Sequence, residues 1–202
     1  MKRFCLPLLL IFTLAPLTQA QKTMVCLGDS LTAGYGAPAG HSYPDYLQHL
    51  LDSRGYHYRV LNMGISGDTT KDAVARLPNV LAAHPALVVV EIGGNDVLRG
   101  LPIAATSANL DRILATLQQA GIKIALAGIT LPPNYGQDYI RAIHQTYAQA
   151  AKKFHVPLLP FIYIHVYNVP GAIQPDGIHA TAKGNALVAK NIFTLIQPML
   201  KK

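Results

Sequence analysis

Ser30 stands in a segment whose residue types could support nucleophilic chemistry. It follows the apolar run 23–27 and lies within Gly28-Asp29-Ser30-Leu31. A short run of β-favouring residues that ends at a glycine predicts a buried strand. Because ligands bind at the carboxyl ends of strands in open parallel α/β sheets, we expect Ser30 at such an edge. The alternative for an isolated Asp-Ser pair is a serine that only begins a helix.

A base and a group to orient it occur together near the end of the chain. A serine hydroxyl is a weak nucleophile at neutral pH and needs a base within hydrogen-bond reach, itself held by a third group. In Asp176-Gly177-Ile178-His179, one turn could aim the carboxylate at one imidazole nitrogen and leave the other for Ser30. An isolated Asp-x-x-His is more often a chance surface pair, so this interpretation depends on the other segments.

Two more segments could stabilise negative charge on a reacting carbonyl oxygen. Gly67 follows one strand-like run and Asn95 follows another. Transition states of acyl transfer need preorganised donors, which the Gly67 amide and the Asn95 side chain could supply. The alternatives are a tight turn at Gly67 and an Asx turn at Asn95. Four chemical elements in loops that should share one sheet edge favour the functional interpretation.

The elements that must position these residues alternate regularly along the chain. Strands are predicted over 24–27, 58–62, 86–92, 122–129 and 156–160. Helices are predicted over 43–53, 71–83, 104–120, 137–153 and 183–200. This order predicts an α/β fold, a three-layer α/β/α sandwich with a five-stranded parallel sheet and right-handed crossovers. Nothing resembling a linker interrupts residues 21–202, so one domain is expected there.

The first twenty residues have the pattern of a secretory signal peptide. A basic start (1–3) precedes an apolar stretch (4–17) that is short for a membrane span, and residues 18–20 place small side chains at the −3 and −1 positions. We therefore predict cleavage before Gln21 and a periplasmic or secreted protein. Loss of Lys2 and Arg3 would lower the formal charge from +7 to +5. Cys26 would then be the only cysteine, expected as a small buried hydrophobe.

Composition and spacing argue against several other classes of function. Lysines and arginines are scattered, without the basic blocks of a nucleic-acid binder, and no nucleotide-binding glycine motif occurs. We expect no cofactor and no metal, because seven further histidines lack ligand spacing; they are His41, His49, His57, His84, His144, His155 and His165. Asp29 and Asp96 are expected to bond backbone amides. The mildly basic surface could make transient contact with membrane lipid, and a monomer is expected.

The four blocks Gly-Asp-Ser-Leu, Ser-Gly-Asp, Gly-Gly-Asn-Asp and Asp-Gly-Ile-His, in this order, resemble the SGNH/GDSL hydrolase superfamily. Residues 27–35, 93–100, 131–136 and 156–161 resemble its exported bacterial acyl-CoA thioesterase, lysophospholipase and arylesterase group. The resemblance implies a flavodoxin-like fold, a triad of Ser30, His179 and Asp176, and an oxyanion hole of Ser30, Gly67 and Asn95. Ala180 departs from the pattern, since relatives often have proline there.

This resemblance implies a serine esterase that hydrolyses acyl esters and thioesters through an acyl-enzyme. Two alternatives are a carbohydrate O-acetylesterase on the same fold and a non-catalytic periplasmic lipid-binding protein. Apolar residues follow two of the predicted strands at this edge, and an apolar groove there would suit a fatty acyl chain. The residues expected to line it are Leu98, Leu101, Pro133 and Tyr135.

Overall fold

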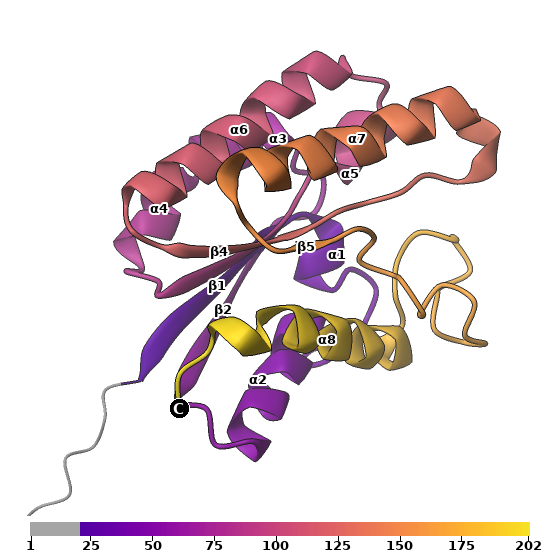
Figure 1. Cartoon of the computed structure of the whole chain (residues 1–202). Helices are drawn as coiled ribbons and strands as arrows, with labels where there is room; N and C mark the ends of the chain where they lie inside the picture. The colour runs from indigo at the N-terminus through magenta and orange to yellow at the C-terminus, as the bar shows by residue number, and fades with distance from the viewer. Residues whose placement is uncertain (1–20) are drawn as a thin grey trace, which may run out of the picture.

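A parallel five-stranded sheet forms the middle layer of the molecule (Figure 1). The computed structural model describes residues 21–202, so the predicted signal peptide lies outside the described residues. The strands are β1 (Lys22–Gly28), β2 (Tyr58–Gly64), β3 (Leu87–Glu91), β4 (Lys123–Ala127) and β5 (Leu158–Leu159). Their order is β2-β1-β3-β4-β5 and every neighbouring pair is parallel, as in flavodoxin-like doubly wound sheets. The predicted three-layer fold is therefore confirmed.

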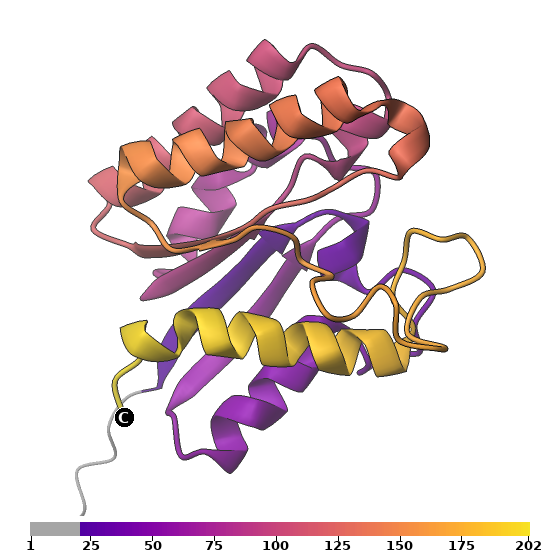
Figure 2. The same ribbon diagram turned by 45° about the vertical axis from the view of Figure 1, so that its right-hand side comes forward.

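Helices cover both faces of the sheet (Figures 1 and 2). One face carries α2 (Tyr43–Ser53) and α8 (Ala182–Ile196); the other carries α3 (Thr70–Ala75), α4 (Leu77–Ala82), α6 (Ile103–Gln119) and α7 (Gln137–Phe154). Alternate residues of β1 enter the two cores, Val25 on the α6 side and Cys26 on the α8 side. Cys26 is fully buried, as predicted. Burial on both faces explains why the strands are apolar without alternation.

Prolines change three of the predicted element boundaries. The helix expected over 71–83 is divided into α3 and α4, because Pro78 cannot continue the hydrogen-bond ladder of α3 and instead lies in the first turn of α4. The last helix ends at Ile196, and Pro198 lies in the 3-10 turn Gln197–Met199 that follows. Strand β5 keeps only two residues between Pro157 and Pro160, since proline has no backbone N–H to donate.

Short helices and one long loop gather at the carboxyl ends of the strands. Helices α1 (Ser30–Ala33) and α5 (Gly94–Leu98) begin directly after β1 and β3, and a 3-10 turn, η1 (Pro133–Tyr135), follows β4. They are too short to show a helical period in the sequence. The long loop 160–181 projects at the same edge, on the right-hand side of Figure 2. Across residues 21–202, no helix combines the length and apolar character needed to cross a bilayer.

Candidate active site

Ser30 is the first residue of α1, in a sharp turn from strand to helix. Asp29 is the N-cap of α1, and its Oδ1 accepts a hydrogen bond from the Leu31 amide at 3.1 Å. A side chain at Gly28 would collide with Thr32 and with the Glu91 carbonyl, so this position requires glycine. The turn exposes Ser30 at the carboxyl edge of the sheet, as its place in the sequence predicts.

The loop 160–181 brings His179 and Asp176 to Ser30. Ser30 Oγ lies 3.0 Å from His179 Nε2, and His179 Nδ1 lies 2.6 Å from Asp176 Oδ2. The other carboxylate oxygen, Asp176 Oδ1, accepts the backbone amides of Ile178 at 2.9 Å and His179 at 3.0 Å. Partial burial would raise the pKa of Asp176, but these amides and the His179 ring lower it to about 2. Asp176 is thus ionised at neutral pH and oriented towards the imidazole.

Gln174 holds this loop against the exit of α1, a role that the sequence did not reveal. Its Nε2 donates to the Tyr35 carbonyl at 2.7 Å and to the Ala180 carbonyl at 2.9 Å. The Tyr35 ring in turn contacts the His179 ring, with centroids 4.7 Å apart. An isolated antiparallel bridge between Ile173 and Ala180 closes the base of the Asp-x-x-His turn. The imidazole is therefore held from two sides.

The loops that carry Gly67 and Asn95 are tied to one another. Asn95 Nδ2 donates to the Asp68 carbonyl at 2.9 Å, and Arg99 Nη2 donates to the Gly67 carbonyl at 2.8 Å. Gly67 has a φ of 90°, a left-handed conformation that favours glycine. Asn95 and Ser30 both line the cavity described below, whereas Gly67 is not among its lining residues. One hydrogen of the Asn95 amide fixes its orientation and the other is left to donate.

Two aspartates shape these turns through backbone amides, as predicted. Besides the contact of Asp29 with Leu31, Asp96 Oδ2 accepts the Thr70 amide at 2.8 Å, and Asp96 Oδ1 is bonded to the hydroxyl groups of Thr70 and Thr106. Asp96 thereby joins α5 to the start of α3 and to α6. Across residues 21–202, no group of three or more His, Cys, Asp or Glu side chains is arranged to hold a metal ion.

A cavity of about 540 Å³ opens beside Ser30, and its walls are mostly apolar. Of the four residues predicted to line it, Leu98 and Tyr135 do so. Leu101 does not: the Leu101 amide bonds the Asp96 carbonyl behind Gly100 (φ 64°), a helix-ending motif that turns the chain away into α6. The Pro133 side chain lies outside the described part of the structure, so its place in the cavity stays a prediction. Lining residues that the sequence did not single out include Leu131, Pro132, Phe161, Tyr163, Tyr167 and Ile178.

A further carboxyl group, which no motif of the sequence pointed to, lies beneath the turn that carries Ser30. Glu91, the only glutamate of the chain, ends β3 and is fully buried. Its Oε2 lies 2.7 Å from Thr32 Oγ1, which lies 3.2 Å from the Tyr43 hydroxyl. Burial, and then repulsion from Asp29, raise the pKa of Glu91 well above its ordinary value. Burial also raises the pKa of Asp29, to about 6.

The proteins that this chain resembles are esterases and acylhydrolases, in agreement with the geometry of the site. The model of the GDSL-like Lipase/Acylhydrolase family matches residues 26–187, which hold all four blocks of the site. The chain belongs to this family. As a member of the GDSL family it is a carboxylic ester hydrolase, and the expected SGNH-type identity is confirmed.

Relatives of the GDSL family resemble the chain over nearly its whole length. It is 40% identical to the esterase TesA of Pseudomonas aeruginosa, over 97% of this chain and 96% of that protein. It is 39% identical to thioesterase 1/protease 1/lysophospholipase L1 of Escherichia coli, over 98% and 94%. A crystal structure of TesA has a TM-score of 0.85 at 40% identity, covering 89% of this chain and all of that one. The esterase EstA of a Pseudoalteromonas species has a TM-score of 0.83 at 29% identity, covering 89% and 98%.

Proposed function

We propose that this chain hydrolyses acyl esters and thioesters through an acyl-enzyme formed on Ser30. The observation that carries the proposal is the line of hydrogen bonds from Ser30 through His179 to Asp176, at the wall of an apolar cavity. The names of the relatives, which include esterase, thioesterase, lysophospholipase and arylesterase, support the same class of substrates. The catalytic unit is a single domain over residues 21–202.

In the first half of the reaction, Ser30 Oγ attacks the acyl carbonyl carbon and His179 Nε2 takes the hydroxyl proton. The ionised Asp176 stabilises the imidazolium that forms and holds its Nδ1–H. Negative charge then develops on the carbonyl oxygen. The amides of Ser30 and Gly67 and the Asn95 side chain donate to this oxyanion, and because Asn95 is already held by Asp68 it needs little reorganisation.

In the second half, His179 returns its proton to the departing oxygen or sulfur as the carbonyl re-forms, which leaves the acyl group on Ser30. A water molecule then gives a proton to His179 and attacks the acyl carbon. Collapse of the second tetrahedral intermediate breaks the bond between the acyl carbon and Ser30 Oγ, which takes the proton back from His179, and the carboxylic acid is released.

The walls of the cavity favour fatty acyl groups over acetyl groups on carbohydrates. Leu98, Leu131 and Tyr135 lie on the side formed after β3 and β4, where an acyl chain would leave water. Each methylene buried in the transition state contributes about 0.8 kcal/mol, so kcat/KM should rise several-fold per added methylene until the cavity is full. The measurement is kcat/KM for monomeric p-nitrophenyl esters from acetate to dodecanoate. A steady fall from acetate onwards would favour the carbohydrate O-acetylesterase instead.

Replacement of the nucleophile tests the proposed chemistry directly. Ser30→Ala should remove nearly all turnover and all covalent labelling by a fluorophosphonate, with thermal unfolding little changed. Ser66→Ala, in the neighbouring Ser-Gly-Asp block, is the matched control and should still be labelled. Labelling at Ser66 in the parent protein would overturn the assignment, and a parent protein that binds lipid but hydrolyses no ester would be a lipid-binding protein.

The proposed cellular setting is the periplasm or the exterior. Cleavage is proposed before Gln21, because the residues at the −3 and −1 positions, 18 and 20, are small. The mature protein, residues 21–202, is proposed to be a monomer. Intact mass of the exported protein gives its first residue. A dominant species that retains residues 1–20 would contradict this proposal.

A further inference from the structure

Exposed apolar side chains are concentrated at one edge of the molecule. Among residues 21–202, the large apolar side chains that are exposed are those of Tyr35, Ile65, Leu98, Leu101, Tyr135, Tyr167 and Ile178. Every one of them lies in a segment that follows a strand at its carboxyl end, and all five strands contribute. Exposed apolar residues that are scattered singly are ordinary, but a gathered set indicates an interaction surface.

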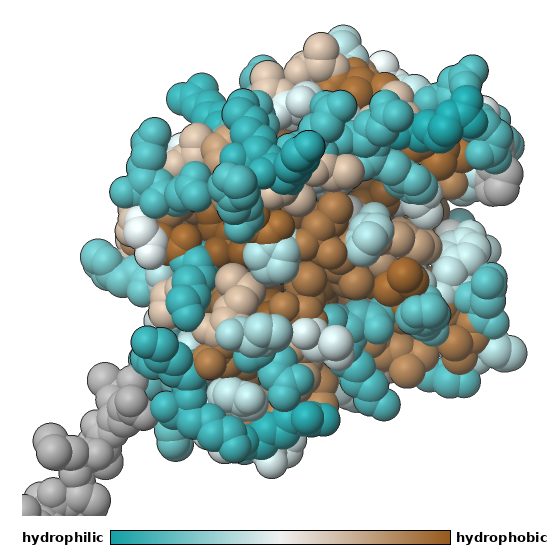
Figure 3. Space-filling model, viewed as in Figure 1, coloured by the Kyte–Doolittle hydropathy of each residue, from teal (hydrophilic) through white to brown (hydrophobic). Residues whose placement is uncertain are grey.

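This set, which we call the apolar rim, shares several residues with the wall of the cavity. Four of its members, Leu98, Tyr135, Tyr167 and Ile178, also line the cavity. Of the remaining three, Tyr35 contacts the His179 ring, Ile65 follows β2 two positions before Gly67, and Leu101 follows α5. In the view of Figure 3, apolar surface runs between the upper and lower helical layers towards the right-hand side, where the carboxyl-edge loops lie. The rim is therefore continuous with the proposed substrate site.

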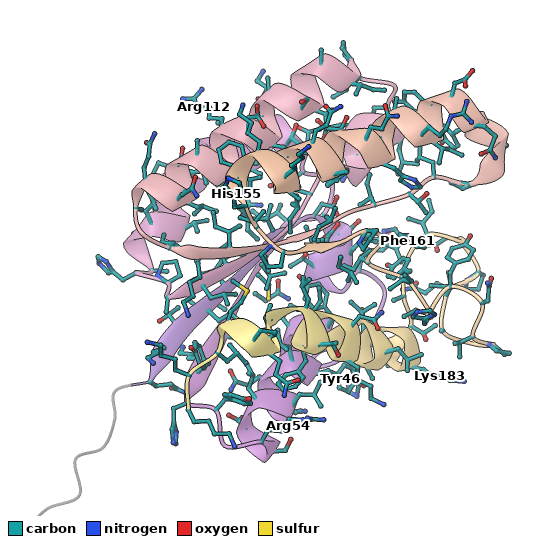
Figure 4. All side chains as sticks on the ribbon, in the orientation of Figure 1. Tyr46, Arg54, Arg112, His155, Phe161 and Lys183 are labelled. Carbon is teal, nitrogen blue, oxygen red and sulfur yellow. The ribbon has the colours of Figure 1, made fainter. Side chains whose placement is uncertain are left out.

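Three exposed cations lie at the same edge as the rim. Lys71 is in the first turn of α3, Arg99 reaches the Gly67 carbonyl, and Lys183 reaches the Pro170 carbonyl of the long loop. Figure 4 shows Lys183 on the right-hand side, near this loop. Within the described part of the chain, none of the three forms an ion pair.

The acidic side chains at this edge are already engaged. Asp68 pairs with Arg76 and Asp138 with Arg141, whereas Asp176 is hydrogen-bonded to the proposed base His179 and keeps its own negative charge. Two further acids, Asp45 and Asp72, cap the first turns of α2 and α3 through Ser42 and Thr69. The three exposed cations are thus matched by the carboxylates of Asp45, Asp72 and Asp176, and what distinguishes these cations is that they form no ion pair among residues 21–202.

We infer that the apolar rim is the surface by which this enzyme docks on a lipid layer, with the cavity mouth facing the layer. Tyrosine has an apolar ring and a polar hydroxyl, which suits the boundary between lipid and water, and three rim members are tyrosines. Lysine and arginine beside such a surface are attracted to anionic head groups. The inference rests on the proposed function, because a lipid layer is where long acyl esters are presented.

Tryptophan reporters test which edge meets the lipid. The chain has no tryptophan, so one introduced residue gives the whole indole emission. In the Ser30→Ala background, which leaves lipid intact, Leu101→Trp reports on the rim and Tyr56→Trp on the opposite edge, where Lys202 lies over the Tyr56 ring. With vesicles of equal parts phosphatidylcholine and phosphatidylglycerol, we expect a blue shift and quenching by brominated acyl chains for Leu101→Trp alone. Quenching of Tyr56→Trp, or of neither reporter, would overturn the inference.

Removal of rim side chains outside the cavity gives the energetic test. Ile65→Ser with Leu101→Ser should weaken vesicle binding by about tenfold or more, because two apolar side chains no longer enter the lipid. Hydrolysis of monomeric p-nitrophenyl butyrate should be unchanged, since neither side chain lines the cavity. Leu200→Ser, near the C terminus at the opposite edge, is the matched control and should bind as the parent does (Figure 1). Equal vesicle binding by all three proteins would refute the role of the rim.

Charge and self-association supply the last discriminating results. Lys71→Gln should weaken binding to the anionic vesicles but not to pure phosphatidylcholine, whereas Lys202→Gln should change neither. Dimerisation that disappears in Ile65→Ser/Leu101→Ser, with no vesicle binding, would show that a second copy covers the rim and would reject the lipid layer. Hydrolysis of monomeric esters is measured separately, so failure of docking and failure of the proposed chemistry are distinguishable.

Discussion

Replacement of the buried glutamate by glutamine should make the stability of this protein less sensitive to pH. Glu91 is fully buried, its Oε1 has no hydrogen-bond partner, and its Oε2 contacts Thr32 in α1, the short helix that begins at Ser30. Burial, and then the charge of Asp29, raise the pKa of Glu91 well above its ordinary value. We therefore expect a neutral carboxylic acid in the folded protein at neutral pH, which glutamine resembles in shape and charge.

The expected size follows from proton linkage. In the unfolded chain a glutamate titrates near its ordinary value of about 4.3. Between that pH and the raised pKa, the folded state holds one proton more than the unfolded state. The free energy of unfolding therefore falls by about 1.4 kcal/mol for each pH unit of increase. Glu91→Gln removes this loss, so its stability relative to the parent should rise by the same amount per pH unit.

The assay is urea unfolding of the parent and Glu91→Gln at several pH values between about 6 and about 8. Asp29 adds a slope of the same sign in both proteins between its ordinary pKa of 3.8 and its raised value of about 6, so the comparison is made above that range. Asp52→Asn, on the exposed surface of α2, is the matched control and should run parallel to the parent. A constant difference between Glu91→Gln and the parent would refute the reasoning, because Glu91 would then be ionised in the folded state.

Three further predictions concern the oxyanion donor, the cavity and a strained helix end. Asn95→Ala should lower kcat by roughly 10²–10³-fold with little change in KM, as for loss of one oxyanion donor; a rise in KM alone would make Asn95 a ground-state contact. Leu98→Ala and Tyr135→Ala should flatten the rise of kcat/KM with acyl length, and Leu101→Ala should not, since it lies outside the cavity. His155→Gly should stabilise the protein by about 1 kcal/mol, because His155 ends α7 with a left-handed φ of 52° that favours glycine. Thermal unfolding measures this effect, and an unchanged or lower midpoint would contradict it.

Much of the fold and of the candidate site follows from local patterns in the sequence. The apolar runs predict all five strands, because a strand buried on both faces must be apolar throughout, as 87–90 are. The residues that the resemblance assigns to chemistry directly follow strands β1, β2 and β3 or lie within one turn of each other. In a parallel sheet these ends must share an edge. The grouping of Ser30 and Asn95 was therefore predictable from the sequence alone, whereas the place of the Asp176–His179 turn beside them was expected only from the resemblance.

Only the tertiary structure decided which side chains enter the cavity and what holds the long loop. Leu98 and Leu101 are equally apolar and three positions apart, yet a left-handed glycine between them turns only the second away from the cavity. The loop 160–181 has no helical or strand periodicity from which its course could be predicted. Its place depends on Gln174, which donates a hydrogen bond to the Tyr35 carbonyl, 139 positions away in the sequence. The sequence gives no sign that Glu91 is buried, because its burial depends on the packing of β1, α1 and α2 around it. Local propensity acts over a few residues, whereas these contacts form only when segments distant in sequence pack together.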